Sequence, residues 1–311
     1  MVNLQFFTNK ILLEDFHLEG PAVVVGLSKY KAILFSRRVI RNLKKDKIEV
    51  VSFYDLIKYS AHFLKDKKIR KRYLVLNQYF LSSYDREINE PFFLFLGGAS
   101  SVGKDLLASD LQHLLGIDRV TPVDVVREAV RSDILKKYKY FSRVPKKLKP
   151  IFKALYRTNQ KGRELQINLI KKKLYNHFIK EGYRECDITG GFHAFFIFHG
   201  SHMVPGIEKE FKGKNKLLVV IDPSEKALRS RILARWEREY GATNKWNRKK
   251  RLEECENLLE IKRYILKKAK ENKGIVIRDD NRLKVLHKFG EVLIERLEKI
   301  LKEKEIKIME V

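Results

Sequence analysis

A short apolar run, a glycine-rich turn and a helical repeat of leucines form the clearest pattern in the chain. Phe92–Leu96 is an unbroken apolar run with the length of a buried strand, and it stops at Gly97-Gly98. From Lys104 onward, leucines recur at helical spacing, at positions 107, 111, 114 and 115. Residues 91–115 therefore predict a strand, a tight loop and a helix in succession.

Apolar runs and amphipathic segments alternate from residue 91 to the end of the chain. The runs that predict strands are Phe92–Leu96, Arg119–Val123, Ala194–Phe198, Leu217–Ile221 and Gly274–Ile277. Helical patterns follow several of them, including Glu225–Tyr240, Asn257–Lys270 and Leu283–Leu301. Such alternation is typical of a mainly parallel sheet with helices on both faces. We therefore predict an α/β domain over residues 91–311.

The first 90 residues have a different pattern and predict a small α+β unit of their own. Short apolar runs at Ala22–Gly26, Ile33–Phe35 and Ile48–Val51 predict strands. Ser36 is a candidate helix cap, and residues 53–64 have the spacing of an amphipathic helix. The basic cluster Lys65–Arg72 is more typical of a solvated turn than of a nucleic-acid patch.

The formal charge of +27 directs attention to anionic ligands, which include nucleic acid, membrane surfaces and small metabolites. The basic residues are spread along the chain and often stand beside glutamate, as in Arg251–Glu260, which favours a solvated face. No apolar stretch approaches the ~20 residues that cross a bilayer, and Met1–Gly20 lacks a signal-peptide layout. Cys186 and Cys255 lack a metal-ligand spacing and indicate ordinary thiols. We expect a soluble, cytoplasmic protein that does not bind membranes.

The loop between the first strand and helix of this domain matches the phosphate-binding pattern G-x-x-x-x-G-K-[S/T] except at its last position. It comprises Gly98, Ala99, Ser100, Ser101, Val102, Gly103, Lys104 and Asp105. In such a loop the backbone N–H groups curl around a phosphate, the lysine reaches its outer oxygens, and the helix dipole assists. A chance glycine-rich turn is the alternative, which the strand before and the helix after disfavour. Asp105 replaces the hydroxyl that normally holds magnesium, and its carboxylate either ligates Mg²⁺ itself or repels the phosphates.

Polar residues also follow the other predicted strands, and chemistry in parallel sheets occurs at the carboxyl ends of strands. Asp124 is a candidate to orient or deprotonate an acceptor hydroxyl, or to cap a helix. Arg127 and Arg131 lie one helical turn apart and are candidates to bind an anionic substrate, or to face solvent. His199 and His202 are candidates for a metal or a general base, but two histidines without a third ligand are weak evidence for a metal. The glycines at positions 200 and 206 indicate instead a tight loop near substrate.

Arginines cluster in the basic helical stretch Glu225–Tyr240, which follows a predicted strand. They stand at positions 229, 231, 235 and 238. Nucleotide kinases carry a mobile basic lid at such a place, and a solvated helix face is the alternative. We predict that Arg231 and Arg235 contact the nucleotide.

Four stretches resemble archaeal 2-phosphoglycerate kinase, a P-loop kinase that makes 2,3-bisphosphoglycerate from 2-phosphoglycerate and ATP. They are Gly97–Lys104, Val120–Glu128, Gly200–Gly206 and Arg229–Arg235. The third is similar to the family's Gly-x-His-x-Val-Pro-Gly and is the most specific. The resemblance covers roughly residues 91–282, and Leu34–Ile40 is similar to the start of an ATP-cone-like module that precedes the kinase in this family.

The resemblance implies a P-loop kinase fold that uses ATP and Mg²⁺ to phosphorylate a small phosphorylated hydroxy acid. Lys104 and the loop then bind ATP, and Asp124 handles the acceptor hydroxyl. Substrate binding falls to Arg127, Arg131 and His202.

Two departures leave other functions open. Asp105 replaces Ser/Thr, and His199 stands where the family pattern has glutamate. These departures motivate a second hypothesis, a non-catalytic nucleotide-binding regulator derived from the family. The charge of +27 motivates a third and less favoured hypothesis, a nucleic-acid-binding or polynucleotide-kinase-like protein.

Overall fold

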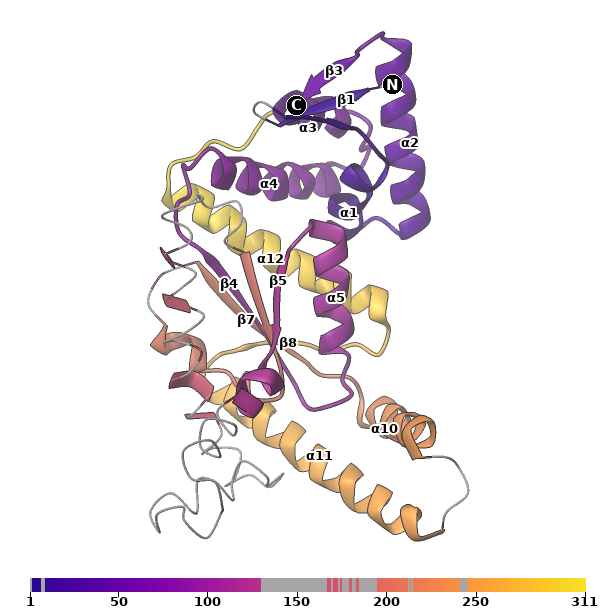
Figure 1. Ribbon diagram of the computed structural model, residues 1–311, viewed down its shortest axis with the longest axis vertical. Coiled ribbons are helices and arrows are strands. Elements are labelled where there is room, and N and C mark those ends of the chain that lie inside the picture. The colour runs from indigo at the N-terminus through magenta and orange to yellow at the C-terminus, as the bar shows by residue number, and fades with distance from the viewer. Residues whose placement is uncertain are drawn as a thin grey trace.

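A five-stranded parallel sheet forms the centre of the computed structural model, which describes residues 2–6, 9–129, 195–211, 213, 215–240 and 245–311, with scattered residues between 167 and 184. Its strands are β4 (Phe92–Gly97), β5 (Arg119–Pro122), β6 (Phe195–His199), β7 (Lys216–Ile221) and β8 (Ile275–Ile277). They run in the order β5-β6-β4-β7-β8, and all their pairings are parallel (Figure 1). The predicted parallel sheet is therefore confirmed.

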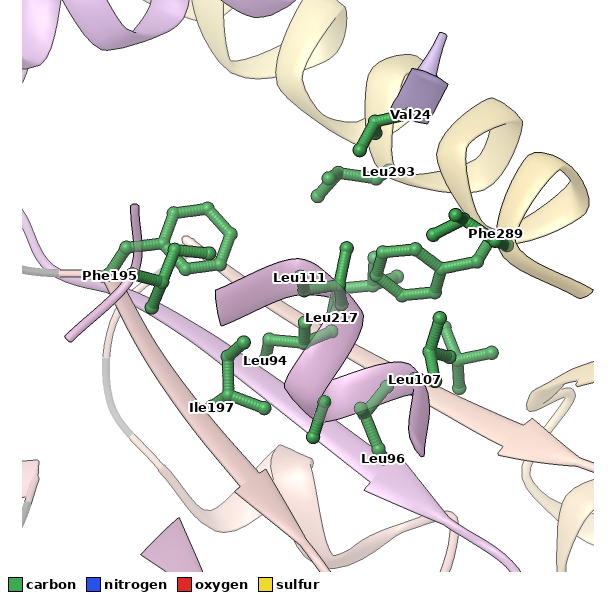
Figure 2. Packing of buried hydrophobic residues seen from close by; sticks show 14 of the residues in the cluster. Val24, Leu94, Leu96, Leu107, Leu111, Phe195, Ile197, Leu217, Phe289 and Leu293 are labelled. Atoms are coloured by element: carbon green, nitrogen blue, oxygen red, sulfur yellow. The ribbon is translucent and has the colours of Figure 1, made fainter. Parts of the chain in front are cut away.

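Both faces of the sheet are buried, by different kinds of side chain. One face packs under helices α5 (Lys104–Leu115) and α12 (Arg282–Glu303), and Figure 2 shows its aliphatic residues, which include Leu94, Leu96, Ile197 and Leu217. The opposite face carries an aromatic layer of Phe93, Phe95, Phe196, Phe198 and Phe211. Alternate residues of a strand point to opposite faces, so burial on both sides requires the unbroken apolar runs seen in the sequence.

Two further helices lie beyond β7, and a buried ion pair fastens the second to the sheet. They are α10 (Glu225–Tyr240) and α11 (Lys245–Glu271). A short 3₁₀ helix, η4 (Ile207–Glu210), lies between β6 and β7. Lys262 of α11 places its Nζ 2.9 Å from Oδ1 of Asp222, which follows β7, and both side chains are buried. The Nε of Arg278, just after β8, lies 3.2 Å from the other carboxylate oxygen of Asp222.

The N-terminal part is an α+β arrangement that packs directly on this sheet and its helices. Its small sheet has the order β2-β1-β3, with β1 (Asn3–Phe6), β2 (Asn9–Leu12) and β3 (Val50–Ser52). Its helices are α1 (Phe16–Val24), α2 (Lys29–Lys45), α3 (Phe53–Ala61) and α4 (Lys67–Tyr84). Helix α4 packs along α12 (Figure 1), and one hydrophobic core runs from Val2 to Met309. The division into domains at residues 90 and 91 stays a prediction.

Two predicted strands of the N-terminal part are helical. Ala22–Gly26 falls on the end of α1, and Ile33–Phe35 lies inside α2, whose cap is Ser28 and not Ser36. The valines favour a strand locally, but close helix contacts decide the conformation of α1. A Cβ at Gly20 of α1 would lie 1.8 Å from the carbonyl oxygen of Leu114, at the end of α5. Strands β1 and β2 were not predicted, and most of the basic cluster at residues 65–72 forms the first turns of α4.

Within the described ranges, no helix combines the length and the apolar composition that a membrane crossing requires.

Candidate functional site

The loop between β4 and α5 is shaped by three residues with a left-handed backbone. Their φ angles are 140° at Gly98, 65° at Ser101 and 103° at Gly103. Gly98 is also required for space, because a Cβ there would lie 2.8 Å from both the Ile221 carbonyl oxygen and a methyl group of Val102. Helix α5 starts directly after Gly103 without a side-chain cap, and the N-terminus of a helix favours an anion.

Lys104 extends back over this loop from the first position of α5. Its side chain is 7% exposed, and its Nζ donates to the carbonyl oxygen of Ala99 at 3.3 Å. The same Nζ lies 3.7 Å from Oδ1 of Asp105. A buried ammonium group needs charged or polar partners to offset its lost hydration, and a phosphate held by the loop is a partner of the right charge.

Asp105 and His199, the two residues that depart from the family pattern, contact each other. His199 ends β6, in register with Leu96 of β4, so its ring lies beside the first turn of α5. The Nδ1 of His199 lies 2.9 Å from Oδ1 of Asp105. This hydrogen bond, with the charge of Lys104 assisting, lowers the pKa of Asp105 to about 2, although desolvation acts in the opposite direction. The carboxylate is therefore ionised at physiological pH.

The donor set around Asp105 fits a magnesium ion shared with a nucleotide. The carboxylate is ionised and its side chain is 71% exposed, which leaves room for a hydrated cation. Mg²⁺ commonly takes one or two carboxylates and completes its shell with waters and phosphate oxygens. In the described part of the chain no three His, Cys, Asp or Glu side chains gather as a metal cluster. The single ionised carboxylate of Asp105 thus suits a magnesium ion whose other ligands are waters and phosphate oxygens.

Two arginines of α10 contact the phosphate loop. Arg231 donates from Nη1 to the Val102 carbonyl oxygen at 2.8 Å and from Nη2 to the Asp280 carbonyl oxygen at 2.7 Å. Arg235 donates from Nη1 to Oγ of Ser100 at 3.1 Å. The two guanidinium groups therefore lie against the outer side of the loop, within the reach of phosphate oxygens bound there.

Asp124, Arg127 and His202 gather at the carboxyl ends of β5 and β6. Oδ1 of Asp124 lies 3.5 Å from Nη1 of Arg127 and 4.0 Å from Nδ1 of His202. The Asp124 side chain is 60% exposed, whereas His202 is 1% exposed. Nη2 of Arg127 also lies 3.3 Å from Glu128, and its buried Nε has no hydrogen-bond partner among the described residues. The cluster combines an accessible carboxylate with a guanidinium that retains donor capacity.

Other residues singled out from the sequence lie elsewhere. Arg131 is outside the described residues. Arg229 pairs with Glu256 of α11 at 2.8 Å and does not join the loop contacts of Arg231. Asp222 also follows a strand, β7, but its carboxylate pairs with Lys262.

Sequence reasoning missed the acidic segment after β8. The carboxylate of Asp280 accepts hydrogen bonds from the N–H and Oγ of Ser224 at 2.7 and 2.8 Å, while its carbonyl oxygen accepts from Arg231. This segment therefore contacts the start of α10 and, through Arg231, is linked to the phosphate loop. The available signal was its position, because Asp279-Asp280-Asn281 follows the last predicted strand of the sheet.

Comparison with known proteins finds curated relatives, although no protein-family model matches the chain. A 2-phosphoglycerate kinase from Methanothermobacter thermautotrophicus is 25% identical over 190 residues, which cover 58% of this chain and 56% of that protein. One from Pyrococcus furiosus is 24% identical over 278 residues, covering 86% and 81%. One from Methanococcus vannielii is 25% identical over 320 aligned residues, covering 96% of each chain. The match thus spans little more than half of the first relative and nearly all of the third.

Solved kinase structures also align with the chain. A shikimate kinase from Bacteroides thetaiotaomicron is 14% identical with a TM-score of 0.36, covering 68% of this chain and 98% of that one. A dephospho-CoA kinase from Campylobacter jejuni is 12% identical with a TM-score of 0.31, covering 68% and 96%. TM-scores this low carry no argument, so the fold assignment rests on the strand order and the loop geometry.

Proposed function

Because the chain is a divergent member of the archaeal 2-phosphoglycerate kinase family, we propose that it transfers the γ-phosphoryl group of ATP to the hydroxyl of 2-phosphoglycerate. The observation that carries the proposal is the phosphate loop with Lys104 and Asp105, at the same edge of a parallel sheet as Asp124. Phosphoryl transfer requires positioning and charge neutralisation, and these residues supply both.

ATP binds with its β- and γ-phosphates in the loop. The backbone N–H groups and Lys104 hold the phosphate oxygens, while Arg231 and Arg235 approach from α10. Asp105 is the residue that would hold magnesium, which when bound neutralises charge on the β- and γ-phosphates. His199 orients the Asp105 carboxylate through its hydrogen bond.

The acceptor binds at the ends of β5 and β6. Arg127, with Arg131, binds the carboxylate and phosphate of the acceptor. The buried His202, whose Nδ1 lies 4.0 Å from Oδ1 of Asp124, supports the Asp124 carboxylate. Asp124 accepts the proton of the acceptor hydroxyl as its oxygen bonds to the γ-phosphorus. The bond from that phosphorus to the bridging oxygen breaks, and ADP leaves with the electron pair.

The test measures transfer of label from [γ-³²P]ATP to 2-phosphoglycerate, with 3-phosphoglycerate as the matched acceptor control. The wild-type protein is expected to convert 2-phosphoglycerate to labelled 2,3-bisphosphoglycerate. The Lys104→Ala variant should form no labelled product, and calorimetry should show that it binds ATP more weakly. ATP binding without transfer to either acceptor would reject kinase activity on these compounds. Equal transfer to both acceptors would reject the choice of 2-phosphoglycerate.

A nucleotide-binding regulator without turnover is the second candidate function. It is favoured by the ionised Asp105 carboxylate, which lies 3.7 Å from the lysine that binds phosphate and adds negative charge there. If the chain is such a regulator, it binds ATP but transfers no label, and the double variant Asp105→Ser/His199→Glu gains activity. Absence of a gain in a folded double variant counts against this candidate.

A further inference from the structure

A cavity of about 280 Å³ lies between the N-terminal helices and the edge of the sheet opposite the phosphate loop. Its walls come from α1, α3 and α4 on one side, and from the end of α5 and the starts of β5 and β6 on the other. The residues that line it include Phe16, Phe53, Asn77, Phe80, Leu115 and Phe195. A cavity of this volume is large enough for a compound of one or two rings, since an apolar cavity of roughly 150 Å³ holds benzene.

Aromatic rings dominate the lining. Phe80 and Phe195 face each other across the two halves of the wall, with ring centroids 6.1 Å apart. At the mouth, Phe16 stacks on His17 with centroids 4.0 Å apart, and Phe16 is 62% exposed although it is a large apolar side chain. Such walls favour a flat ring that stacks on or abuts the phenylalanines.

The described lining residues of the cavity carry little positive charge. The chain has 66 lysines and arginines, yet none of the residues described as lining this cavity is either. The polar groups there are two histidines, Asp118 and the amide of Asn77. Burial lowers the pKa of His17, which keeps that imidazole neutral near pH 7. Among the described lining residues, an acidic ligand would therefore meet the carboxylate of Asp118 and no lysine or arginine, which disfavours an anion.

Asn77 provides one buried polar position. It is 3% exposed, and its Nδ2 donates to the carbonyl oxygen of Tyr73 at 2.7 Å. No hydrogen bond from the described residues reaches its Oδ1. Asn77 lines the cavity, and its Oδ1 is accessible rather than enclosed, so this oxygen can accept a hydrogen bond from a ligand that brings an N–H or O–H group.

From this geometry we propose that the cavity is a second ligand site, which takes an uncharged, flat aromatic molecule bearing a hydrogen-bond donor. The phosphate loop lies at the start of α5, whereas the cavity lies at its other end, so the cavity is separate from the proposed ATP and acceptor sites. The ring packs among Phe80, Phe195 and Leu115, and its donor reaches Oδ1 of Asn77.

The test uses three flat aromatic probes, titrated by saturation-transfer NMR, to compare the effects of the hydrogen-bond donor and of charge. Indole is flat and carries one N–H, naphthalene lacks the donor, and indole-3-carboxylate adds a negative charge. Indole is expected to bind saturably, and naphthalene about tenfold more weakly, the effect of one hydrogen bond. Indole-3-carboxylate should bind more weakly than indole. Absence of saturable indole binding, or tighter binding of the anion, would overturn the proposal.

Variants locate the binding and control for folding. Asn77→Leu should abolish the difference between indole and naphthalene while it continues to bind naphthalene, which shows that the variant is folded. Leu115→Trp fills the cavity and should lose indole binding at least tenfold, whereas Leu106→Trp, on the exposed side of the same helix, should retain it. Equal indole affinities in the two tryptophan variants would place the probe elsewhere and reject the site.

Discussion

Asp105 and His199 stand 94 residues apart in the chain and meet at 2.9 Å beside the phosphate loop. Each departure alone weakens the resemblance to the kinase family, because one removes a hydroxyl and the other an acid from positions that the resemblance implies would serve metal and phosphate. Together they preserve one carboxylate at this place, with the acid moved from the strand end to the helix start. The contact therefore favours an exchange of roles over independent loss of function.

Mutation of this pair tests the exchange through metal affinity rather than activity. We expect Asp105→Asn to weaken Mn²⁺ binding in the presence of ADP, measured by electron paramagnetic resonance, because an anionic ligand is lost. His199→Phe should weaken it by about 10–100-fold, as is typical when a ligand loses its orienting partner. The double variant Asp105→Ser/His199→Glu should regain affinity relative to Asp105→Ser alone. Unchanged Mn²⁺ affinity in Asp105→Asn would contradict the assignment of this carboxylate.

Helices α5 and α10 connect the site to the rest of the molecule in different ways. Helix α10 brings Arg231 and Arg235 to the loop from one side, while Arg229 turns toward α11. Helix α5 presents its uncapped N-terminus to the loop and ends against Gly20 of α1. The periodicity of each helix was visible in the sequence, but which side meets a partner depends on how the helices pack.

The arginines of α10 are expected to differ in their effect on ATP affinity. Arg235→Ala removes a donor beside the loop and should weaken ATP binding by about 10–150-fold, since one hydrogen bond to a charged group contributes about 1.5–3 kcal/mol. Arg229→Ala, whose guanidinium pairs with Glu256, is the matched control and should leave affinity within about twofold. Calorimetry measures the ATP affinity of both variants. Equal losses of affinity would mean that the total positive charge, and not the position of the arginine, determines ATP binding.

The contact between α1 and α5 should be sensitive to a single methyl group. A Cβ at Gly20 would lie 1.8 Å from a backbone oxygen of α5, so Gly20→Ala forces the helices apart and should cost about 1–3 kcal/mol of unfolding free energy. At Gly116 a Cβ meets nothing within 4 Å, and Gly116→Ala bears only the cost of its left-handed φ of 64°. Urea denaturation of both variants compares the two effects. A Gly20→Ala protein as stable as wild type would contradict the close approach.

At the scale of the whole molecule, the N-terminal part and the sheet share one core. Phe289, Leu293 and Leu297 of α12 are fully buried, and α12 is covered by α4 and α1. A Cβ at Gly290 of α12 would lie 1.9 Å from the Val24 carbonyl oxygen, which shows how closely α1 approaches it. The pattern of apolar residues in positions 1–90 predicted an α+β unit. It did not predict that this unit packs on α5 and α12, which belong to the part of the chain after residue 90.

Removal of residues 1–90 should therefore prevent stable folding of the remainder. The fragment 91–311 would expose the apolar side of α12, so we expect it to lack a cooperative thermal transition and to bind a hydrophobic dye. The full chain is the control and should unfold cooperatively. A fragment that unfolds cooperatively and binds ATP as the full chain does would establish two independent domains.

Local sequence determined the sheet strands, the phosphate loop and the helices that follow them. Burial on both faces demands continuous apolar runs, and a left-handed loop demands glycine, so both leave a direct signal in the residues. Tertiary structure alone decided three features. Ala22–Gly26 falls on the end of a helix, Arg229 pairs with α11 and not with the phosphate loop, and His199 contacts Asp105. These outcomes depend on contacts between residues distant in sequence, which no local pattern encodes. The order of the strands and the packing of the helices create these contacts, and the contacts determine the geometry of the site.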